Sequence, residues 1–476
     1  MKKLIVFNLS LILLLSLVLI GCQPKQDAAQ PSVQPKATAT PKKERVATRE
    51  KQLPEWMKNA VMYEVNIRQY THEGTFAAFE PHLQRLKDLG VDVIWFMPIH
   101  PISKENRKGV LGSYYSVADY KGVNPEFGTM DEFKALVKKC HDMGFHVIMD
   151  WVANHTGWDN PWIKEHPEWY TRTAAGKIIH PPGTDWTDVA DLNFKNEDMS
   201  EAMIEAMAFW VKEADVDGFR EDHASGVPVK FWKDVRIELD NIKPVFMLAE
   251  DNSDMEMLRK AFDANYSWEF YHMMDDVAQE KRTLGMAFSS FFSKMSRNYP
   301  DGTIPLQFIT NHDENSWNGS EFERFKEGAV PAMAALYFTV PGIPLVYSGQ
   351  EAALTKRLKF FEKDEIDWTD MSLTNVYQDL IRFKHENAAL WNGKNGGDID
   401  TIDTSDEKVL AYTRKKDGNQ VIILLNLSSA PSKVTVKYHS QQGKYHTFPE
   451  PQEVTLKDEQ NYELKPWEYR LFYRNQ

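Results

Sequence analysis

The chain has 476 residues, of which 42% are hydrophobic and 12% are aromatic. This composition supplies a large core and excludes wholesale disorder. The 56 Lys and Arg residues against 69 Asp and Glu residues give a net charge of −13; such a chain lacks the positive field that phosphate contacts need, so nucleic acid is excluded as an expected partner.

The N-terminal segment predicts export. Two lysines precede an apolar run over residues 4–20, which is typical of a secretory signal, although about 17 apolar residues also nearly suffice for a membrane-spanning helix. The sequence Leu19-Ile20-Gly21-Cys22 resembles the bacterial lipobox, in which the signal is cleaved and the cysteine is lipidated. We therefore predict a lipoprotein signal over residues 1–22, a lipid anchor on Cys22, and an exported protein held on the periplasmic or cell-surface face of a membrane.

Residues 23–52 predict a spacer. They are rich in Pro, Gln, Ala, Thr and Lys and have no apolar period that could form a core. An extended proline-rich chain of this length reaches ~90 Å at ~3.1 Å per residue.

A series of helix, glycine and strand units occupies residues 53–395. The predicted strands are residues 63–67, 91–96, 145–149, 216–219, 244–248, 306–309 and 343–347. Gly90 ends the helix before the second strand, and Thr129 with Glu132 forms a capping box at the start of the next helix. Cys140 falls on the apolar face of that helix and is expected in the core. This alternation predicts an α/β fold with a parallel sheet, either open or closed into a (β/α)8 barrel.

Two further regions depart from this alternation. A long polar insert, about residues 156–197, follows the strand that ends near Asp150, and loops of that length tend to be functional. From residue 396 to residue 476, short strands and an Asp417-Gly418 turn predict a small antiparallel β domain.

Four polar stretches follow apolar strands directly. They are Asp150-Trp151-Val152-Ala153-Asn154-His155, Gly218-Phe219-Arg220-Glu221-Asp222, Met247-Leu248-Ala249-Glu250 and Phe308-Ile309-Thr310-Asn311-His312-Asp313. In a parallel barrel the carboxyl ends of the strands converge, so Asp222, Glu250 and Asp313 are expected in a single cleft.

Three carboxylates beside an arginine suit glycoside hydrolysis. Two carboxyl groups ~5–5.5 Å apart can act as nucleophile and as acid/base with retention of configuration. Arg220 lies two residues before Asp222 on the same strand and is expected to keep Asp222 ionised. Neighbouring carboxylates are expected to raise the pKa of Glu250. A divalent-metal site is the competing interpretation of this cluster.

The four stretches resemble, in order and spacing, the core motifs of the α-amylase family of glycoside hydrolases. Asp191-Leu192-Asn193 matches an additional motif of that family, and flanking segments match over about residues 55–390. The resemblance implies a (β/α)8 TIM barrel with a small B insert after the third strand, and a C-terminal antiparallel β-sandwich over residues 396–476.

The resemblance also implies roles for individual residues. Asp222 matches the nucleophile, Glu250 the general acid/base and Asp313 the third acid, which grips sugar hydroxyls. The residues that match substrate-binding positions are Arg220, His155, His312 and Tyr115.

One position departs from the family pattern. Many α-amylases have His or Lys four residues after the nucleophile, where this chain has Gly226. In calcium-dependent members that backbone and Asn154 help to hold Ca²⁺. Asn154 is present, but the other ligands cannot be assigned, so the metal site stays unknown; no cofactor is required for the chemistry itself.

The main functional prediction is an α-amylase-like enzyme that cleaves α-1,4-glucosidic bonds in starch or maltooligosaccharides by double displacement. A cyclodextrin hydrolase, an α-glucosidase or a glucanotransferase would use the same fold, and a catalytically dead glucan-binding lipoprotein is the alternative from another class. Aromatic residues crowd the insert and are expected either to stack on glucose rings or to form its own small core; they are Trp158, Trp162, Trp169, Tyr170 and Trp186.

Overall fold

The computed structural model describes residues 45–48, 50–251 and 254–475. The predicted signal, Cys22 and the spacer up to residue 44 lie outside the described residues. Among the residues that are described, no helix combines the length and the apolar character needed to span a bilayer.

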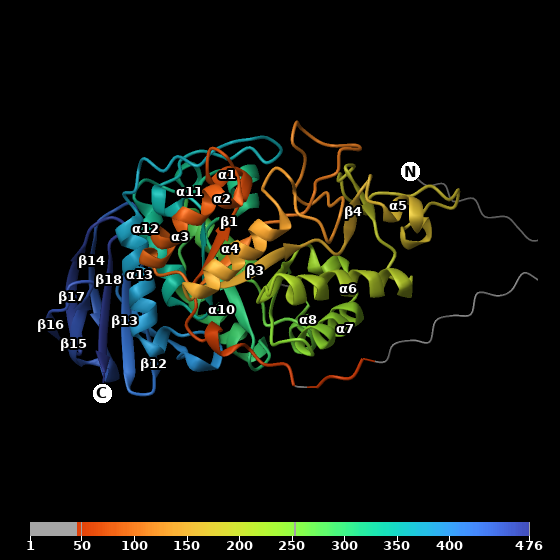
Figure 1. Cartoon of the computed structure of the whole chain (residues 1–476). Coiled ribbons are helices and arrows are strands. Elements are labelled where there is room, and N and C mark those ends of the chain that lie inside the picture. The colour runs from red at the N-terminus through yellow and green to blue at the C-terminus, as the bar shows by residue number, and fades with distance from the viewer. Residues whose placement is uncertain (1–44, 49, 252–253, 476) are drawn as a thin grey trace, which may run out of the picture. The chain divides into compact units, whose positions relative to one another are not determined.

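Eight parallel strands close into a barrel, in the spatial order β1-β10-β9-β8-β7-β6-β3-β2. Two of them, β1 and β3, are labelled among the surrounding helices in Figure 1. The barrel strands are β1 (Met62–Val65), β2 (Val93–Phe96), β3 (His146–Trp151), β6 (Gly218–Glu221), β7 (Phe246–Ala249), β8 (Ala264–Tyr266), β9 (Ile304–Gln307) and β10 (Ile343–Tyr347). Pairing of β1 with β10 closes the sheet, so the closed barrel is confirmed over the open sheet. The short strand β8 was not predicted.

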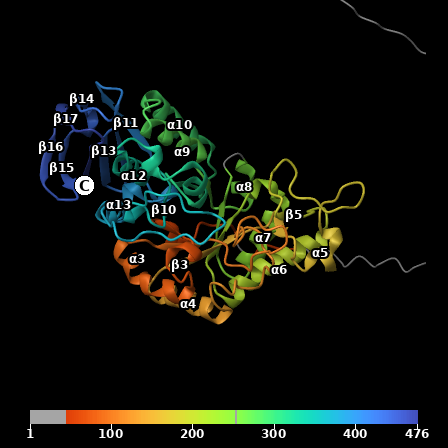
Figure 2. The ribbon, with the colours of Figure 1, turned by 90° about the horizontal axis from the view of Figure 1, so that it is seen from above.

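Helices surround these strands, as the view from above shows (Figure 2). The helices are α1 (Ile67–Tyr70), α2 (Phe76–Phe79), α3 (Leu83–Leu89), α4 (Met130–Asp142), α6 (Glu197–Glu213), α7 (Val229–Asp240), α8 (Met255–Lys260), α9 (Trp268–Ala278), α10 (Gly285–Asn298), α11 (Glu321–Arg324), α12 (Ala329–Thr339) and α13 (Thr374–Glu386). Their apolar faces pack on the outer face of the strands in one core, while a second core fills the barrel interior.

Local sequence signals define the ends of these helices. Gly90 ends α3 with φ of 97°, a left-handed conformation that glycine adopts without steric cost. Thr129 and Glu132 form both hydrogen bonds of the capping box at the start of α4. Cys140, on the same helix, is a buried free cysteine, as predicted, and burial raises the pKa of its thiol to about 12.

The segment before β1 lies against the amino-terminal end of the barrel. Trp56 stacks on His146 with ring centroids 4.1 Å apart. Arg45 pairs with Glu201 on α6 at 2.6 Å and with Glu238 on α7 at 3.1 Å, and Lys51 donates to the Leu258 carbonyl at 2.9 Å. The prediction of a solvated spacer up to residue 52 is therefore wrong for Arg45 and Lys51, because carboxylates on α6 and α7 bind Arg45 and a backbone carbonyl binds Lys51.

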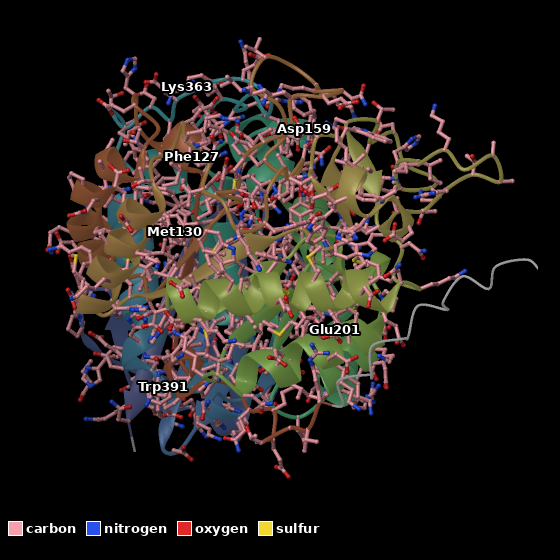
Figure 3. All side chains as sticks on the ribbon, turned by 45° about the vertical axis from the view of Figure 1, so that its right-hand side comes forward. Phe127, Met130, Asp159, Glu201, Lys363 and Trp391 are labelled. Atoms are coloured by element: carbon pink, nitrogen blue, oxygen red, sulfur yellow. The ribbon has the colours of Figure 1, made fainter. Side chains whose placement is uncertain are left out.

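The loops that follow the strands gather at the other end. Asp159 in the insert and Lys363 after β10 lie at one end of the barrel, whereas Trp391, after α13, lies at the opposite end (Figure 3). The insert contains α5 (Trp162–Glu165) and a two-stranded antiparallel ribbon of β4 (His155–Gly157) with β5 (Val189–Asp191).

The C-terminal strands form an eight-stranded antiparallel arrangement in the order β16-β15-β18-β13-β12-β11-β14-β17. They are β11 (Ile399–Thr404), β12 (Val409–Lys416), β13 (Asn419–Asn426), β14 (Ser432–Lys437), β15 (Gly443–Phe448), β16 (Glu453–Leu456), β17 (Glu459–Leu464) and β18 (Tyr469–Asn475). Strand β11 pairs with β12 along one part and with β14 along the other, so it joins the two halves that enclose one core. Buried Arg414 donates to the Thr339 carbonyl on α12 at 3.1 Å and fastens this domain to the barrel.

Candidate active site

The carboxyl ends of the barrel strands open into a cavity of about 740 Å³. The predicted site residues on its wall are Tyr115, His155, Asp222, Glu250 and Asp313. Arg220 and His312 are buried and contact these residues directly. The structure therefore brings together all the predicted site residues except Cys22, which lies outside the described residues.

The strand ladder aligns Asp222 and Glu250. The Asp222 N–H donates to the Trp151 carbonyl at the end of β3, and the Glu250 N–H donates to the Glu221 carbonyl at the end of β6. Each carboxylate thus belongs to the first residue beyond its strand and is fixed by the neighbouring strand. Side chains at the carboxyl ends of adjacent parallel strands share one face of the barrel.

Arg220 is the cation that these carboxylates share. Its Nη1 lies 3.0 Å from Asp150 Oδ1 and 3.2 Å from Asp222 Oδ1, and its Nη2 lies 2.8 Å from Glu250 Oε1. The guanidinium is fully buried, and its Nε donates to Tyr266 Oη at 3.2 Å. Because the two terminal nitrogens of one planar guanidinium bind oxygens of Asp222 and Glu250, the two carboxyl groups lie side by side on the cavity wall.

Burial raises the pKa of both groups. Burial, reinforced by Asp222 and Asp313, raises the pKa of Glu250 to about 7, against the opposing effect of Arg220. Burial also raises the pKa of Asp222. Arg220 favours the ionised form of Asp222, as the sequence predicted, but burial and the neighbouring Asp313 raise the pKa of Asp222 by more than Arg220 lowers it.

Asp313 and His312 form a pair of opposite charge. His312 Nε2 lies 3.3 Å from Asp313 Oδ2, and His312 Nδ1 lies 2.5 Å from Glu64 Oε1. Burial by itself lowers the pKa of the His312 ring. The neighbouring carboxylates of Asp313 and Glu64 more than offset this effect and raise the pKa of His312 well above its ordinary value. Burial likewise opposes ionisation of Asp313, yet His312 and Arg220 lower the pKa of Asp313. The geometry therefore favours an imidazolium beside an ionised Asp313.

Tyr115 connects the two sides of the site. Its hydroxyl lies 2.7 Å from His312 Nε2 and donates to Asp150 Oδ2 at 3.0 Å. Its ring lies on the cavity wall, nearly parallel to the ring of Phe360, with an interplanar angle of 16°. The Tyr115 ring therefore offers a flat apolar surface to the cavity, while buried His312 and Asp150 fix its hydroxyl group.

His155 differs from His312 in charge. It is buried at the start of β4, and burial lowers the pKa of its ring to about 4. Its Nδ1 lies 3.2 Å from Asn154 Nδ2, and its ring lies 5.6 Å from that of Trp186. His155 is therefore a neutral hydrogen-bonding group on the cavity wall.

The predicted calcium ligand Asn154 has protein neighbours. Beyond its contact with His155, its Oδ1 lies 2.5 Å from where a Cβ at Gly226 would stand. The part of the chain that the structure describes contains no group of three or more His, Cys, Asp or Glu residues placed to hold a metal ion. Calcium binding stays an expectation of the family resemblance.

Three residues of the site were not predicted. Glu64 lies inside β1 and pairs with His312, and the signal for it was a carboxylate inside the apolar run 63–67. His223 follows Asp222 and donates its backbone N–H to Glu250 Oε2 at 2.8 Å. Trp317 donates its indole N–H to Asp313 Oδ1 at 3.2 Å. The last two contacts depend on loop conformation, for which the sequence has no periodic signal.

The aromatic residues of the insert divide between the two predicted roles. Trp169 and Tyr170 are buried, and Trp158 and Trp162 pack against the core. Trp186 lines the cavity next to His155. Most of these rings therefore stabilise the insert itself, and one faces the site.

Comparison with known families agrees with this geometry. The model described as "Alpha amylase, catalytic domain" matches residues 50–181 and 183–398, and "Maltogenic Amylase, C-terminal domain" matches residues 399–471. The chain belongs to the alpha-amylase family of glycoside hydrolases. The family resemblance, the barrel fold with its C-terminal β domain, and the enzymatic class predicted from the motifs are confirmed.

Individual relatives cover most of the chain. Alpha-amylase 3 of Dictyoglomus thermophilum is 26% identical over 78% of this chain and 85% of that protein. The cyclomaltodextrinase of Thermoanaerobacter pseudethanolicus is 24% identical over 79% of this chain and 71% of that protein. Among solved structures, a noncanonic maltogenic alpha-amylase from Thermotoga neapolitana is 29% identical with a TM-score of 0.80, covering 88% of this chain and 100% of that chain.

Proposed function

We propose that this protein hydrolyses α-1,4-glucosidic bonds in starch or maltooligosaccharides with retention of configuration. The observation that supports this most directly is the shared guanidinium of Arg220, which holds Asp222 and Glu250 side by side on one cavity wall. Closely placed carboxyl groups leave no room for a water between nucleophile and sugar, which is the arrangement of retaining glycosidases.

In the first half of the reaction Glu250 is the acid and Asp222 the nucleophile. The Glu250 carboxyl protonates the glycosidic oxygen, the C1–O bond breaks, and an Asp222 oxygen forms a bond to C1. Glu250 is suited to this step because the pKa of about 7 keeps a large fraction of it protonated at neutral pH. The departing chain leaves with its new hydroxyl group.

In the second half a water molecule replaces the departed chain. The Glu250 carboxylate removes a proton from that water, whose oxygen attacks C1 and releases Asp222. Two inversions at C1 give an α-configured product. Asp313 and His155 supply charged and neutral partners for the hydroxyl groups of the sugar, His312 holds Asp313 in place, and Tyr115 supplies the flat surface on which the sugar ring rests.

The pH dependence follows from Glu250. Because the free enzyme needs a protonated Glu250, kcat/KM is expected to be high below about pH 7 and to fall about tenfold per pH unit above it. Protonation of Asp222 is expected to form the acidic limb. Initial rates on maltotriose between pH 4 and pH 9 measure both limbs, and a kcat/KM that rises through pH 8 would contradict the role given to Glu250.

Substrate preference is tested with three glucans. The maltogenic C-terminal domain model and the cyclomaltodextrinase relatives favour a cyclodextrin hydrolase as the second candidate on the same site. Soluble starch, cyclodextrin and maltotriose are incubated with the protein, and product length and anomeric configuration are followed by NMR. Mixed short α-anomeric products from starch support the proposal, preferred attack on cyclodextrin supports the second candidate, and a β-anomeric product rejects the mechanism.

We also propose that the protein acts outside the cytoplasm, anchored through lipidated Cys22. The support is the lipobox-like segment that ends at Cys22 and the apolar run before it. Several acyl chains at ~0.8 kcal/mol per buried CH₂ would bind the membrane firmly. Labelled palmitate fed to the cells is expected to be incorporated into the wild-type protein and not into the Cys22→Ala protein; a wild-type protein that takes up no label would reject the anchor.

A further inference from the structure

Trp317 is an exposed aromatic residue on the wall of the active-site cavity. Its side chain retains 53% exposure, although it lines the cavity together with Asp313. Large apolar surface left open inside a polar cavity marks a place where a ligand binds. Phe322, on α11, is 38% exposed but does not line the cavity, so exposure alone does not distinguish Trp317, whereas its position does.

The indole of Trp317 also contacts the third carboxylate of the site. Its N–H donates to Asp313 Oδ1 at 3.2 Å, while His312 Nε2 lies 3.3 Å from the other oxygen, Oδ2. Both oxygens of Asp313 are thus fixed, one by a charged ring and one by an exposed ring. A hydrogen bond to an ionised acceptor is stronger than one between neutral groups.

The backbone presents Trp317 in a defined orientation. It lies in a single π-helical turn, Glu314–Asn318, that begins directly after Asp313. The Gly319 N–H closes the turn on the Glu314 carbonyl at 3.0 Å, and Arg357 Nη1 donates to the Trp317 carbonyl at 3.2 Å. Single π-helical turns are frequent at functional sites, because they turn one side chain out of the helical register.

The neighbouring rings extend this surface. Trp317 packs on Phe360 with centroids 5.3 Å apart and on Phe361 at 5.8 Å. Phe360 in turn lies nearly parallel to Tyr115. Flat rings therefore continue from Tyr115, the predicted platform at the cleavage point, outward to Trp317.

We propose that Trp317 binds the glucosyl unit adjacent to the one held by Asp313, by stacking, and at the same time positions Asp313 through its indole N–H. This inference rests on the proposed glucan substrate and adds a specificity-determining residue to it. The C–H faces of a pyranose ring pack well on an aromatic face. Occupation of the second sugar position would then fix the indole, and with it the carboxylate that grips the first sugar.

Two substitutions separate the two roles of Trp317. Trp317→Phe keeps an aromatic face but has no N–H, so kcat on maltoheptaose is expected to fall about tenfold with KM within twofold of the wild type. Trp317→Ala removes both functions, so KM is expected to rise about 2- to 12-fold in addition to the loss in kcat. Phe322→Ala, from the same region but outside the cavity, is the matched control and is expected to leave both constants unchanged.

Binding measured without turnover completes the test. Maltoheptaose is titrated calorimetrically into the Asp222→Asn protein with and without Trp317→Ala, and the second substitution is expected to weaken binding 2- to 12-fold. Equal affinity and an unchanged KM in Trp317→Ala would overturn the stacking role, and an unchanged kcat in Trp317→Phe would overturn the positioning role. A wild-type protein that hydrolyses no glucan at all would instead reject the proposed function, so the two failures are distinguishable.

Discussion

Replacing Asp222 with Asn is expected to lower turnover of maltotriose and starch by at least about 10³-fold while sugar binding persists. The amide keeps the shape of the side chain and its place beside Arg220 Nη1, but it cannot form the bond to C1. Loss of a group that reacts directly costs a factor of this size or more. Initial rates and calorimetric titration with maltoheptaose measure the two effects separately.

The control for this substitution is Asp185→Asn. Asp185 is an exposed aspartate on the rim of the same cavity, and its amide variant is expected to retain turnover within about threefold of the wild type, since losses at exposed charges are small. Turnover of the Asp222→Asn protein close to that of the wild type would reject the double-displacement mechanism, and loss of both turnover and binding would show that Asp222 mainly holds the site together.

Replacing Arg220 with Met is expected to destabilise the protein by about 3–5 kcal/mol and to abolish turnover. Removal of one partner of a buried ion pair leaves the others without compensation, and Arg220 has three partners: Asp150, Asp222 and Glu250. Arg220→Lys keeps the charge but not the planar fork, so it is expected to recover stability in part and turnover hardly at all. Thermal unfolding and initial rates measure both.

The loss of stability in Arg220→Met is expected to depend on pH. Without the guanidinium, burial acts unopposed and raises the pKa of Asp150, Asp222 and Glu250 further in the folded state. An acid whose pKa is higher folded than unfolded loses stability as pH rises above its unfolded pKa of about 4. The deficit relative to wild type should therefore be larger at pH 8 than at pH 5.

Arg236→Met provides the matched control. Arg236 is also buried and ion-paired, with Asp240 at 3.3 Å and with Asp263, but its partners do not line the cavity, whereas Asp222 and Glu250 do. Its loss is expected to destabilise the fold while leaving kcat near the wild-type value below the unfolding temperature. Equal loss of kcat in both variants would show that Arg220 acts on turnover only through stability.

Much of the architecture could be predicted from the sequence because its signals are local. The capping box of Thr129 and Glu132, the left-handed Gly90 and the apolar runs each define the end of one element. The placement of Asp222, Glu250 and Asp313 at strand ends follows from the same runs, since parallel strands end on one face. Strand β8 was missed because its three residues, Ala264–Tyr266, give no recognisable period.

The features that could not be predicted depend on contacts between distant segments. Closure of the barrel requires β1 to pair with β10. The hydrophobic pattern within a strand does not indicate which other strand it pairs with. The contact of Trp317 with Asp313 depends on the π-helical turn Glu314–Asn318. The contact of Arg45 with Glu201 depends on how the segment before β1 runs along helix α6. The raised pKa of Asp222 depends on its burial and on the nearby Asp313, which only the assembled site determines.

The seam that closes the barrel also makes the active site depend on residues from both ends of the barrel domain. Glu64, near the start of the described chain, pairs with His312, and the neighbouring Tyr63 donates its hydroxyl to Glu351. The first strand of the barrel therefore completes its pairing only with residues 343–351. A chain truncated before residue 343 would retain Asp222, Glu250 and Asp313 but would lack the strand that closes the barrel, so we expect it to show no turnover.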